Sequence, residues 1–202
     1  MLYIIFLLKL AFVVLMAYLI GSIPTGYLIV KLKTGQDIRQ VGSGSTGATN
    51  VKRVLGKNWF FIVMILDALK GALPVLIAKY CFLDKFGILA LFASLFVIIG
   101  HSKPNYLQFK GGKSVASGVG TILALNPLVG LSIAIIWATI TYLSKDVSLG
   151  SIVALAWSPF LMYFFHNPIG YIIYCTIAAI YIIYLHRENI KRLIEGRENK
   201  VR

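Results

Sequence analysis

Charged residues are scarce in this sequence. Only 13% of the 202 residues are charged, whereas 58% are apolar and the mean hydropathy is +0.82. A soluble domain has about 25% charged and about 45–50% apolar residues. The composition therefore excludes a water-soluble globule and a disordered chain, and it indicates an integral membrane protein.

Acidic residues and cysteines are scarcer still. Asp and Glu together number 7 against 20 Lys and Arg, which gives a formal net charge of +13. The basic residues cluster between apolar runs, which is typical of membrane-protein loops rather than of a nucleic-acid-binding surface. Cys81 and Cys175 lie in or beside apolar runs and predict neither a disulfide nor a metal-ligand pair. We expect the lipid bilayer as a partner, no nucleic acid, no metal and no cofactor.

Seven apolar runs predict the fold. They cover residues 2–30, 59–80, 86–100, 114–125, 128–143, 148–165 and 169–185. A transmembrane helix needs about 20 residues, and the first run is longer than this, so we expect tilt and a bend at residues 21–24, where Pro24 interrupts the helix. The fourth run is short, and it either crosses a locally thinned bilayer or forms a re-entrant segment.

The distribution of Lys and Arg separates these two alternatives. If all seven runs cross, 16 basic residues, Arg202 among them, lie on one face and only Lys79 and Lys85 lie on the other. If the fourth run turns back, the count becomes nine against nine. The positive-inside rule favours the first arrangement. We predict an all-α integral membrane protein with seven transmembrane helices, the N-terminus outside, the C-terminus cytoplasmic, and a single domain over residues 1–202.

The first polar stretch on the predicted cytoplasmic face is the loop of residues 34–57. It contains the run Gly42-Ser43-Gly44-Ser45-Thr46-Gly47-Ala48-Thr49-Asn50, followed by Arg53. Glycines let backbone N–H groups approach a ligand closely, and a following Arg suits a phosphate. The P-loop spacing is absent. A flexible Gly/Ser linker is the alternative interpretation.

A second polar stretch, residues 109–117, opens the fourth apolar run with Gly111, Gly112 and Lys113. Free backbone donors, the positive end of a helix dipole and a lysine together favour an anion site. The alternative is that Lys113 only satisfies the positive-inside rule. Glycine-loop N–H groups with Arg53, Lys113 and Lys70 would form two phosphate sites.

Polar residues in or beside the apolar runs form further candidates. Asp67 and Lys70 lie three apart inside the second run, either as a buried ion pair or with Lys70 reaching a substrate. His101 is a general-base candidate or an interfacial residue. His186 and Asn189 lie one turn apart at the end of the last run, and the charged residues that follow them are typical of an interfacial helix.

Together these motifs resemble the acyl-phosphate glycerol-3-phosphate acyltransferase family of bacteria, known as PlsY. The matching stretches cover almost the whole chain. They are Gly21–Gly26, Gly42–Asn50 with Arg53, Asp67–Gly71, Gly100–His101, Phe109–Lys113 and His186–Glu198. The sequence departs from the family pattern at Ser45, where Asn is usual, at Ser114, where Gly is usual, and at Lys103, where an aromatic residue is common.

The resemblance implies an enzyme of the bacterial cytoplasmic (inner) membrane, multi-pass, with its active site on the cytoplasmic side. Its substrates would be acyl phosphate and glycerol 3-phosphate, and its products lysophosphatidic acid and phosphate, in the first acylation step of phospholipid synthesis. Neither acyl-CoA nor acyl carrier protein would be the direct donor. The rival hypotheses are a membrane transporter for a phosphorylated solute and another lipid-phosphate enzyme.

The expected roles of individual residues follow from the motifs and the resemblance. Catalytic roles are expected for Ser43, His186 and Asn189. Phosphate binding is expected of Arg53, Lys113, Lys70, Asn50, Gly44, Gly47, Gly111 and Gly112, with His101 and Ser45 as further candidates, and structural roles are expected for Asp67 and Glu198. An acyl phosphate has a good leaving group, so no covalent nucleophile is needed. We expect a donor phosphate oxygen to accept the proton, Asn189 to stabilise the oxyanion and His186 to position its partners.

Overall fold

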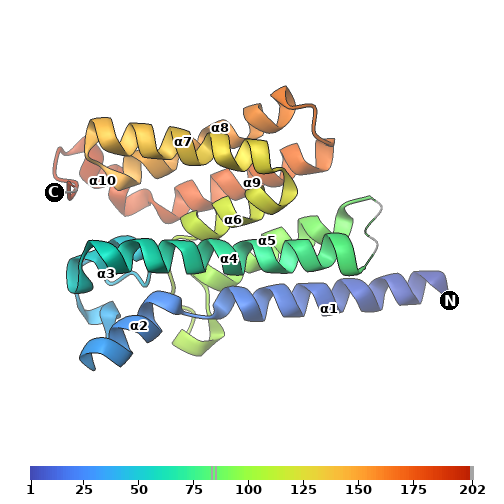
Figure 1. The fold of residues 1–202 in the computed structure, drawn as a ribbon, viewed down its shortest axis with the longest axis horizontal. Helices are drawn as coiled ribbons and strands as arrows, with labels where there is room; N and C mark the ends of the chain where they lie inside the picture. The colour runs from blue at the N-terminus through green and yellow to red at the C-terminus, as the bar shows by residue number, and fades with distance from the viewer. Residues whose placement is uncertain (83, 85, 201–202) are drawn as a thin grey trace. The chain divides into compact units, whose positions relative to one another are not determined.

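The computed structural model describes residues 1–82, 84 and 86–200, and within these residues it contains helices and no strand (Figure 1). Two basic residues of the topology prediction, Lys85 and Arg202, lie outside the described residues. The chain divides into two compact units, Met1–Ala124 and the residues from Leu125 onward. Each unit is described by itself, and the single domain over residues 1–202 stays a prediction.

The first unit contains six α-helices and two short 3-10 helices. In chain order they are α1 (Leu2–Ser22), α2 (Thr25–Thr34), η1 (Ile38–Gln40), α3 (Ala48–Leu55), α4 (Lys57–Cys81), α5 (Ile88–Ser102), η2 (Asn105–Leu107) and α6 (Val115–Leu125). Helix α1 packs along α5, and α4 contacts α1, α3 and α5. The polar stretch of residues 34–57, expected to be a loop, is helical in its second half, so Arg53 lies on α3.

The predicted bend in the first apolar run is confirmed. Helix α1 ends at Ser22 and α2 begins at Thr25 after Pro24, so the run consists of two helices, visible in Figure 1 as the blue segments. Proline has no N–H to continue the helical hydrogen bonds, and Thr25 N–H donates instead to the Ile23 carbonyl over 3.0 Å. The break leaves a polar backbone segment at the end of a long apolar helix.

Glycines bring the helices of this unit into close backbone contact. A Cβ on Gly21 would overlap the Val97 carbonyl oxygen, so α1 and α5 meet there without an intervening side chain. A Cβ on Gly71 of α4 would overlap the Ser117 carbonyl oxygen of α6 in the same way. Small residues at helix crossings allow the dispersion contacts that hold helices together within lipid.

The second unit is a group of four helices joined by short loops. It contains α7 (Pro127–Ser144), α8 (Val147–Phe164), α9 (Ile169–Leu185) and α10 (Arg187–Ile194). Asn126 caps α7, because its Oδ1 accepts the N–H groups of Leu128 and Val129, and Pro127 occupies the first helical position, where no N–H is needed. Helix α8 contacts both α7 and α9, and α10 packs against α8 and α9.

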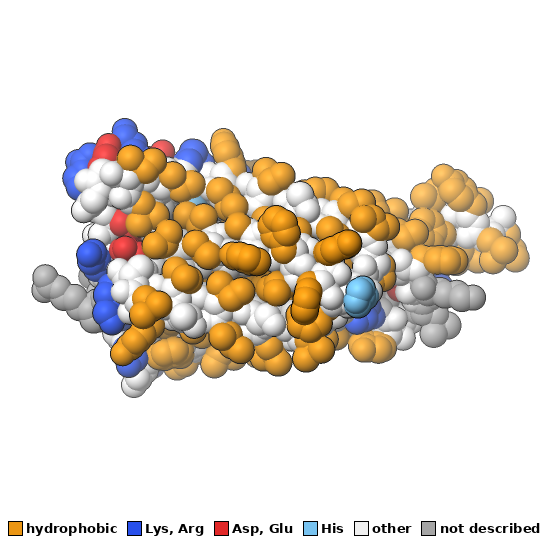
Figure 2. Space-filling view, turned by 90° about the horizontal axis from the view of Figure 1, so that it is seen from above, with side chains coloured by type: hydrophobic (Ala, Val, Ile, Leu, Met, Phe, Trp, Pro, Cys, Tyr) orange, Lys and Arg blue, Asp and Glu red, His pale blue; other side chains and the backbone are white. Residues whose placement is uncertain are grey.

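The apolar runs predicted from the sequence are helical in both units. Among the described residues, five helical segments are long and apolar enough to cross a membrane, and a sixth is obtained if α9 and α10, bent by 63°, are one span. Helix α6 has 11 residues and rises only about 16 Å, roughly half of a hydrocarbon core of about 30 Å. Figure 2 shows hydrophobic side chains over most of the visible surface, as expected for contact with lipid. The count of seven spans stays a prediction.

Candidate functional site

Asn50 organises the glycine-rich loop of the first unit. The side chain of Asn50 is only 1% exposed, and its Oδ1 accepts the Ser43 N–H over 3.1 Å. Its Nδ2 donates to the carbonyl oxygens of Val41 and Ser45, both at 2.9 Å, and of Ile38 at 3.2 Å. The segment is therefore an ordered loop and not a flexible Gly/Ser linker. Both N–H bonds of Asn50 point at loop carbonyls, and the phosphate contact expected of this residue stays a prediction.

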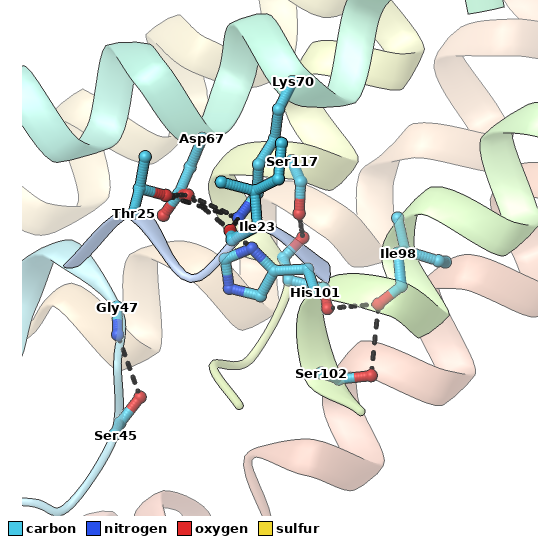
Figure 3. A network of polar contacts seen from close by, with 11 residues as sticks. Ile23, Thr25, Ser45, Gly47, Asp67, Lys70, Ile98, His101, Ser102 and Ser117 are labelled. Carbon is cyan, nitrogen blue, oxygen red and sulfur yellow. Dashed lines mark hydrogen bonds and ion pairs between the residues drawn. The ribbon is translucent and has the colours of Figure 1, made fainter. Parts of the chain in front are cut away.

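The amides of two loop glycines are also engaged inside the loop. Gly44 N–H donates to the Val41 carbonyl over 3.1 Å, and Gly47 N–H donates to Ser45 Oγ over 3.3 Å (Figure 3). Gly44 has a φ of +68°, a conformation that glycine adopts at little cost. The structure thus gives these glycines a role in shaping the loop, and their role in phosphate binding stays a prediction.

Arg53 and Ser43 are the two exposed candidates of this loop and helix. Neither side chain forms a hydrogen bond or an ion pair with another residue in the described part of the chain. A Cβ on Gly42 would lie 3.4 Å from Arg53 Cδ, so the aliphatic part of Arg53 runs beside the glycine loop. The Arg53 guanidinium is therefore free to bind an anion next to an ordered loop.

Arg39 also supports this loop. Its guanidinium pairs with Asp37 at 2.6 Å, and the hydrogen bond from Arg39 lowers the pKa of the Asp37 carboxyl. The Arg39 Nη1 also reaches the Leu107 carbonyl of η2 at 3.5 Å. Sequence reasoning missed this support, because Arg39 is one of many loop arginines and lysines and no spacing distinguishes it.

The buried carboxylate and ammonium inside α4 form an ion pair. Lys70 Nζ lies 2.8 Å from Asp67 Oδ1, and the two side chains are 8% and 2% exposed. Lys70 also donates to the Ile23 carbonyl at 2.6 Å and to Thr25 Oγ1 at 3.3 Å, and Thr25 Oγ1 donates to Asp67 (Figure 3). These contacts join α4 to the break between α1 and α2.

These contacts favour the buried ion pair, and the alternative in which Lys70 reaches the substrate stays untested. An ammonium group has three donors, and those of Lys70 have three protein acceptors. Asp67 keeps the structural role that we expected. Thr25 was not identified from the sequence, although it lies inside the stretch Gly21–Gly26 that carried the resemblance.

His101 lies in the last turn of α5 and packs against the Gly111–Lys113 segment. Its side chain is buried, Nδ1 is 3.8 Å from Asp67 Oδ1, and Nδ1 has no hydrogen-bond partner in the described part of the chain. A Cβ on Gly112 would overlap the His101 ring at Nε2. The ring is thus enclosed between Asp67 and Gly112, which favours a packing role over that of a general base.

The Gly111–Lys113 segment is held to α5 by its backbone. Gly111 N–H donates to the Ser102 carbonyl at 3.2 Å, and Gly112 N–H donates to the His101 carbonyl at 3.1 Å. The sequence predicts two free donors here, but both amides donate to α5 in this structure, and phosphate binding by Gly111 and Gly112 stays a prediction. Lys113 follows directly and is half-buried, just before α6 begins.

The backbone conformation of Ser114 explains why glycine is usual at this position in the family. Its φ is +60°, in the left-handed region that glycine adopts without strain. The side chain offsets part of this strain, because Ser114 Oγ donates a hydrogen bond to the Ile98 carbonyl over 2.7 Å.

In the second unit, His186 ends α9 and is 4% exposed. Its Nδ1 lies 2.8 Å from the Ile182 carbonyl oxygen. A carbonyl only accepts hydrogen bonds, so Nδ1 carries a hydrogen and, in the neutral ring, Nε2 is the acceptor. This contact fixes the orientation of the imidazole.

Glu198 holds Asn189 in place. Glu198 Oε1 accepts from Asn189 Nδ2 at 2.7 Å and from Ser148 Oγ at 2.9 Å, while Oε2 accepts from Arg192 Nε at 2.7 Å. Burial alone would raise the pKa of Glu198, but the hydrogen bonds from Arg192, Asn189 and Ser148 lower it below its usual value. These contacts agree with the structural role expected of Glu198, and they add Ser148, which the sequence did not identify.

A family model described as glycerol-3-phosphate acyltransferase matches residues 11–196 of the chain. The glycerol-3-phosphate acyltransferase of Synechococcus elongatus is 45% identical over 201 residues, covering 96% of each chain, and that of Nostoc sp. is 43% identical over 94% of this chain and 90% of its own length. The chain belongs to the glycerol-3-phosphate acyltransferase family.

Solved structures of the family agree with this assignment. The crystal structure of the integral membrane glycerol 3-phosphate acyltransferase PlsY in its glycerol 3-phosphate form is 41% identical, with a TM-score of 0.89 over 96% of both chains. The lysophosphatidic acid form is 39% identical, with a TM-score of 0.85 over 96% of this chain and 95% of its own. The PlsY family, the integral membrane character and the acyltransferase class predicted from the sequence are confirmed.

Proposed function

We propose that the chain transfers a fatty acyl group from acyl phosphate to the 1-hydroxyl of sn-glycerol 3-phosphate. The hydroxyl oxygen attacks the acyl carbon, the bond between that carbon and the phosphate oxygen breaks, and the hydroxyl proton passes to the departing phosphate. The products are lysophosphatidic acid and phosphate. The observation that carries the proposal is the 41% identity, over 96% of both chains, to an acyltransferase solved with glycerol 3-phosphate.

Two phosphate groups require two positively charged sites, and the roles of individual residues are part of the proposal. The exposed Arg53, which has no partner within the described residues, supports one site beside the ordered glycine loop. Lys113, immediately before the N-terminus of α6, supports the other, because a cation and a helix dipole both favour an anion. Ser43, with its exposed hydroxyl, is proposed to contact a substrate at the first site.

The remaining chemistry is assigned to His186 and Asn189. The Nδ1 contact with the Ile182 carbonyl, which fixes the orientation of the imidazole, supports a positioning role for His186. One Nδ2–H bond of Asn189 is directed at Glu198, which supports a fixed amide suited to stabilising developing negative charge. The donor phosphate itself accepts the proton.

The proposed topology has seven crossings, with the N-terminus outside and the active site on the cytoplasmic side of the inner membrane. The 16-to-two distribution of Lys and Arg supports it. Helix α6 is the short crossing, and the Lys79 ammonium, 2.9 Å from the Ala124 carbonyl, satisfies one backbone acceptor near its C-terminal end. A buried backbone acceptor without a partner would be costly in lipid.

A donor comparison with the purified protein tests the function. Glycerol 3-phosphate is supplied with palmitoyl phosphate, palmitoyl-CoA or palmitoyl carrier protein, and lysophosphatidic acid and phosphate are measured. We expect turnover with palmitoyl phosphate, with equal amounts of the two products, and less than a hundredth of that rate with either thioester. Equal or faster turnover with a thioester would overturn the proposed donor.

A further inference from the structure

We infer that Asn50 is a positioning residue for the reaction: it fixes the glycine loop of residues 38–47 onto α3 so that the loop and Arg53 face one phosphate together. The inference rests on the proposed function, because it assumes that Arg53 binds a substrate phosphate. It assigns to Asn50 an action through the loop and no contact with substrate.

The hydrogen bonds of Asn50 carry the argument. They reach four loop residues, Ile38, Val41, Ser43 and Ser45, from a single side chain that is 1% exposed. Three of these four contacts use the Asn50 Nδ2 group as donor. The oxygens of a phosphate dianion only accept hydrogen bonds, and the two N–H bonds of Asn50 already face three carbonyl oxygens. The side chain therefore has no donor to offer a phosphate.

Gly42 connects the loop to both helix residues. A Cβ on Gly42 would overlap Asn50 Oδ1 and would lie 3.4 Å from Arg53 Cδ, so the Gly42 backbone rests against both side chains. Asn50 and Arg53 are three residues apart and share one face of α3. The φ of Gly42 is +61°, which a larger residue adopts only with strain. The same helical face thus holds the loop at Asn50 and presents the guanidinium at Arg53.

The conservative variant Asn50→Asp tests the acceptor oxygen and the donor NH2 group of Asn50 separately. An aspartate can still accept the Ser43 N–H, but it has no donor for the carbonyls of Ile38, Val41 and Ser45. A buried carboxylate facing three carbonyl oxygens is also electrostatically unfavourable. Asn50→Asp should therefore be impaired at least as strongly as Asn50→Ala.

Amide hydrogen exchange of the substrate-free protein gives the first readout. In Asn50→Ala and Asn50→Asp, peptides covering residues 38–47 should exchange at least tenfold faster, while peptides of α4 and α5 should exchange at the wild-type rate. Loss of a residue that only contacts substrate would leave exchange in the substrate-free loop unchanged. Unchanged exchange would overturn the inference.

Steady-state kinetics give the second readout. The KM for one of the two phosphate-bearing substrates should rise at least tenfold in Asn50→Ala, and the KM for the other should change less than twofold. A variant that merely reduced the folded fraction would lower the apparent kcat and leave both KM values unchanged. That result would overturn the positioning role.

A matched control and a second variant complete the experiment. Asn58 is an exposed asparagine in the first turn of α4 that forms no side-chain hydrogen bond within the described residues, so Asn58→Ala should keep wild-type exchange and kinetics. Gly42→Ala keeps Asn50 but displaces the loop from it, and it should reproduce the Asn50→Ala signature even if Asn50→Ala fails to fold. If the wild-type protein showed no acyl transfer, the proposed function and this inference would both be rejected. If the wild-type protein transferred the acyl group and both Asn50→Ala and Gly42→Ala kept the wild-type KM values, this inference alone would be rejected.

Discussion

At the scale of single residues, Arg53 differs from the other basic candidates in having an exposed guanidinium without a partner among the described residues. A guanidinium can bind a phosphate through two parallel hydrogen bonds, which an ammonium cannot reproduce. Arg53→Lys should therefore lower kcat/KM at least tenfold, equivalent to about 1.4 kcal/mol. Arg39→Lys is not a suitable control, because Arg39 supports the loop. The control is Lys57→Arg, at an exposed position, which should keep wild-type kinetics. Wild-type kcat/KM in Arg53→Lys would contradict phosphate binding by Arg53.

Glu198 gives a prediction about pH at the same scale. Its hydrogen bonds lower its pKa in the folded state, so the carboxylate stabilises the fold at a pH above the unfolded value of about 4.3. This stabilisation should be lost as the pH falls through the lower, folded pKa. Glu198→Gln should lack it, so the melting temperatures of wild type and variant, measured in detergent, should differ most at neutral pH and converge in acid. A difference that stays constant down to pH 3 would contradict this account.

At the scale of elements, the break between α1 and α2 depends on the ion pair of α4. Lys70 donates to the Ile23 carbonyl, which at the break accepts the Thr25 N–H in place of the N–H group that it would bind in a continuous helix. Lys70→Met should remove that donor and leave the Asp67 carboxylate buried without its cation. Removal of one partner of a buried pair costs about 3–5 kcal/mol.

The matched experiment is a double-mutant cycle in thermal unfolding. Lys70→Met and Asp67→Asn should each lower the melting temperature, and the double variant should be more stable than the sum of the single losses predicts. Lys57→Met, at an exposed lysine of the same helix, should have no effect beyond error. Additive losses would show that the two charges do not stabilise each other.

At the scale of the whole molecule, the proposed topology predicts on which side of the membrane each loop lies. A reporter that is active only in the cytoplasm should be active when fused after residue 56, after residue 112 or at the C-terminus, and inactive after residue 84. The fusions on either side of α6, after residues 112 and 126, should give opposite results. Identical results at these two positions would place both ends of α6 on the same side of the membrane. Helix α6 would then not cross, and the proposed orientation of every later segment would be inverted.

The helices and the family could be predicted from the amino-acid sequence. Each apolar run is helical in the structure, and the bend at residues 21–24 is present, because both depend on local properties: run length, hydropathy and a proline without an N–H. The ordered motifs were sufficient to identify the PlsY family, which the family model and the relatives confirm.

The contacts of the polar residues in those motifs could not be predicted from the sequence, because they depend on the fold. Lys70 bonds to Ile23, 47 residues earlier in the chain, and Asn50 bonds to carbonyls up to 12 residues away, so neither partner could be read from spacing. The amides of Gly111 and Gly112 looked free in the sequence but donate to α5. A backbone or side-chain donor has a fixed number of hydrogen bonds to give, and whether protein or substrate receives them depends on which acceptors the fold brings within about 3 Å.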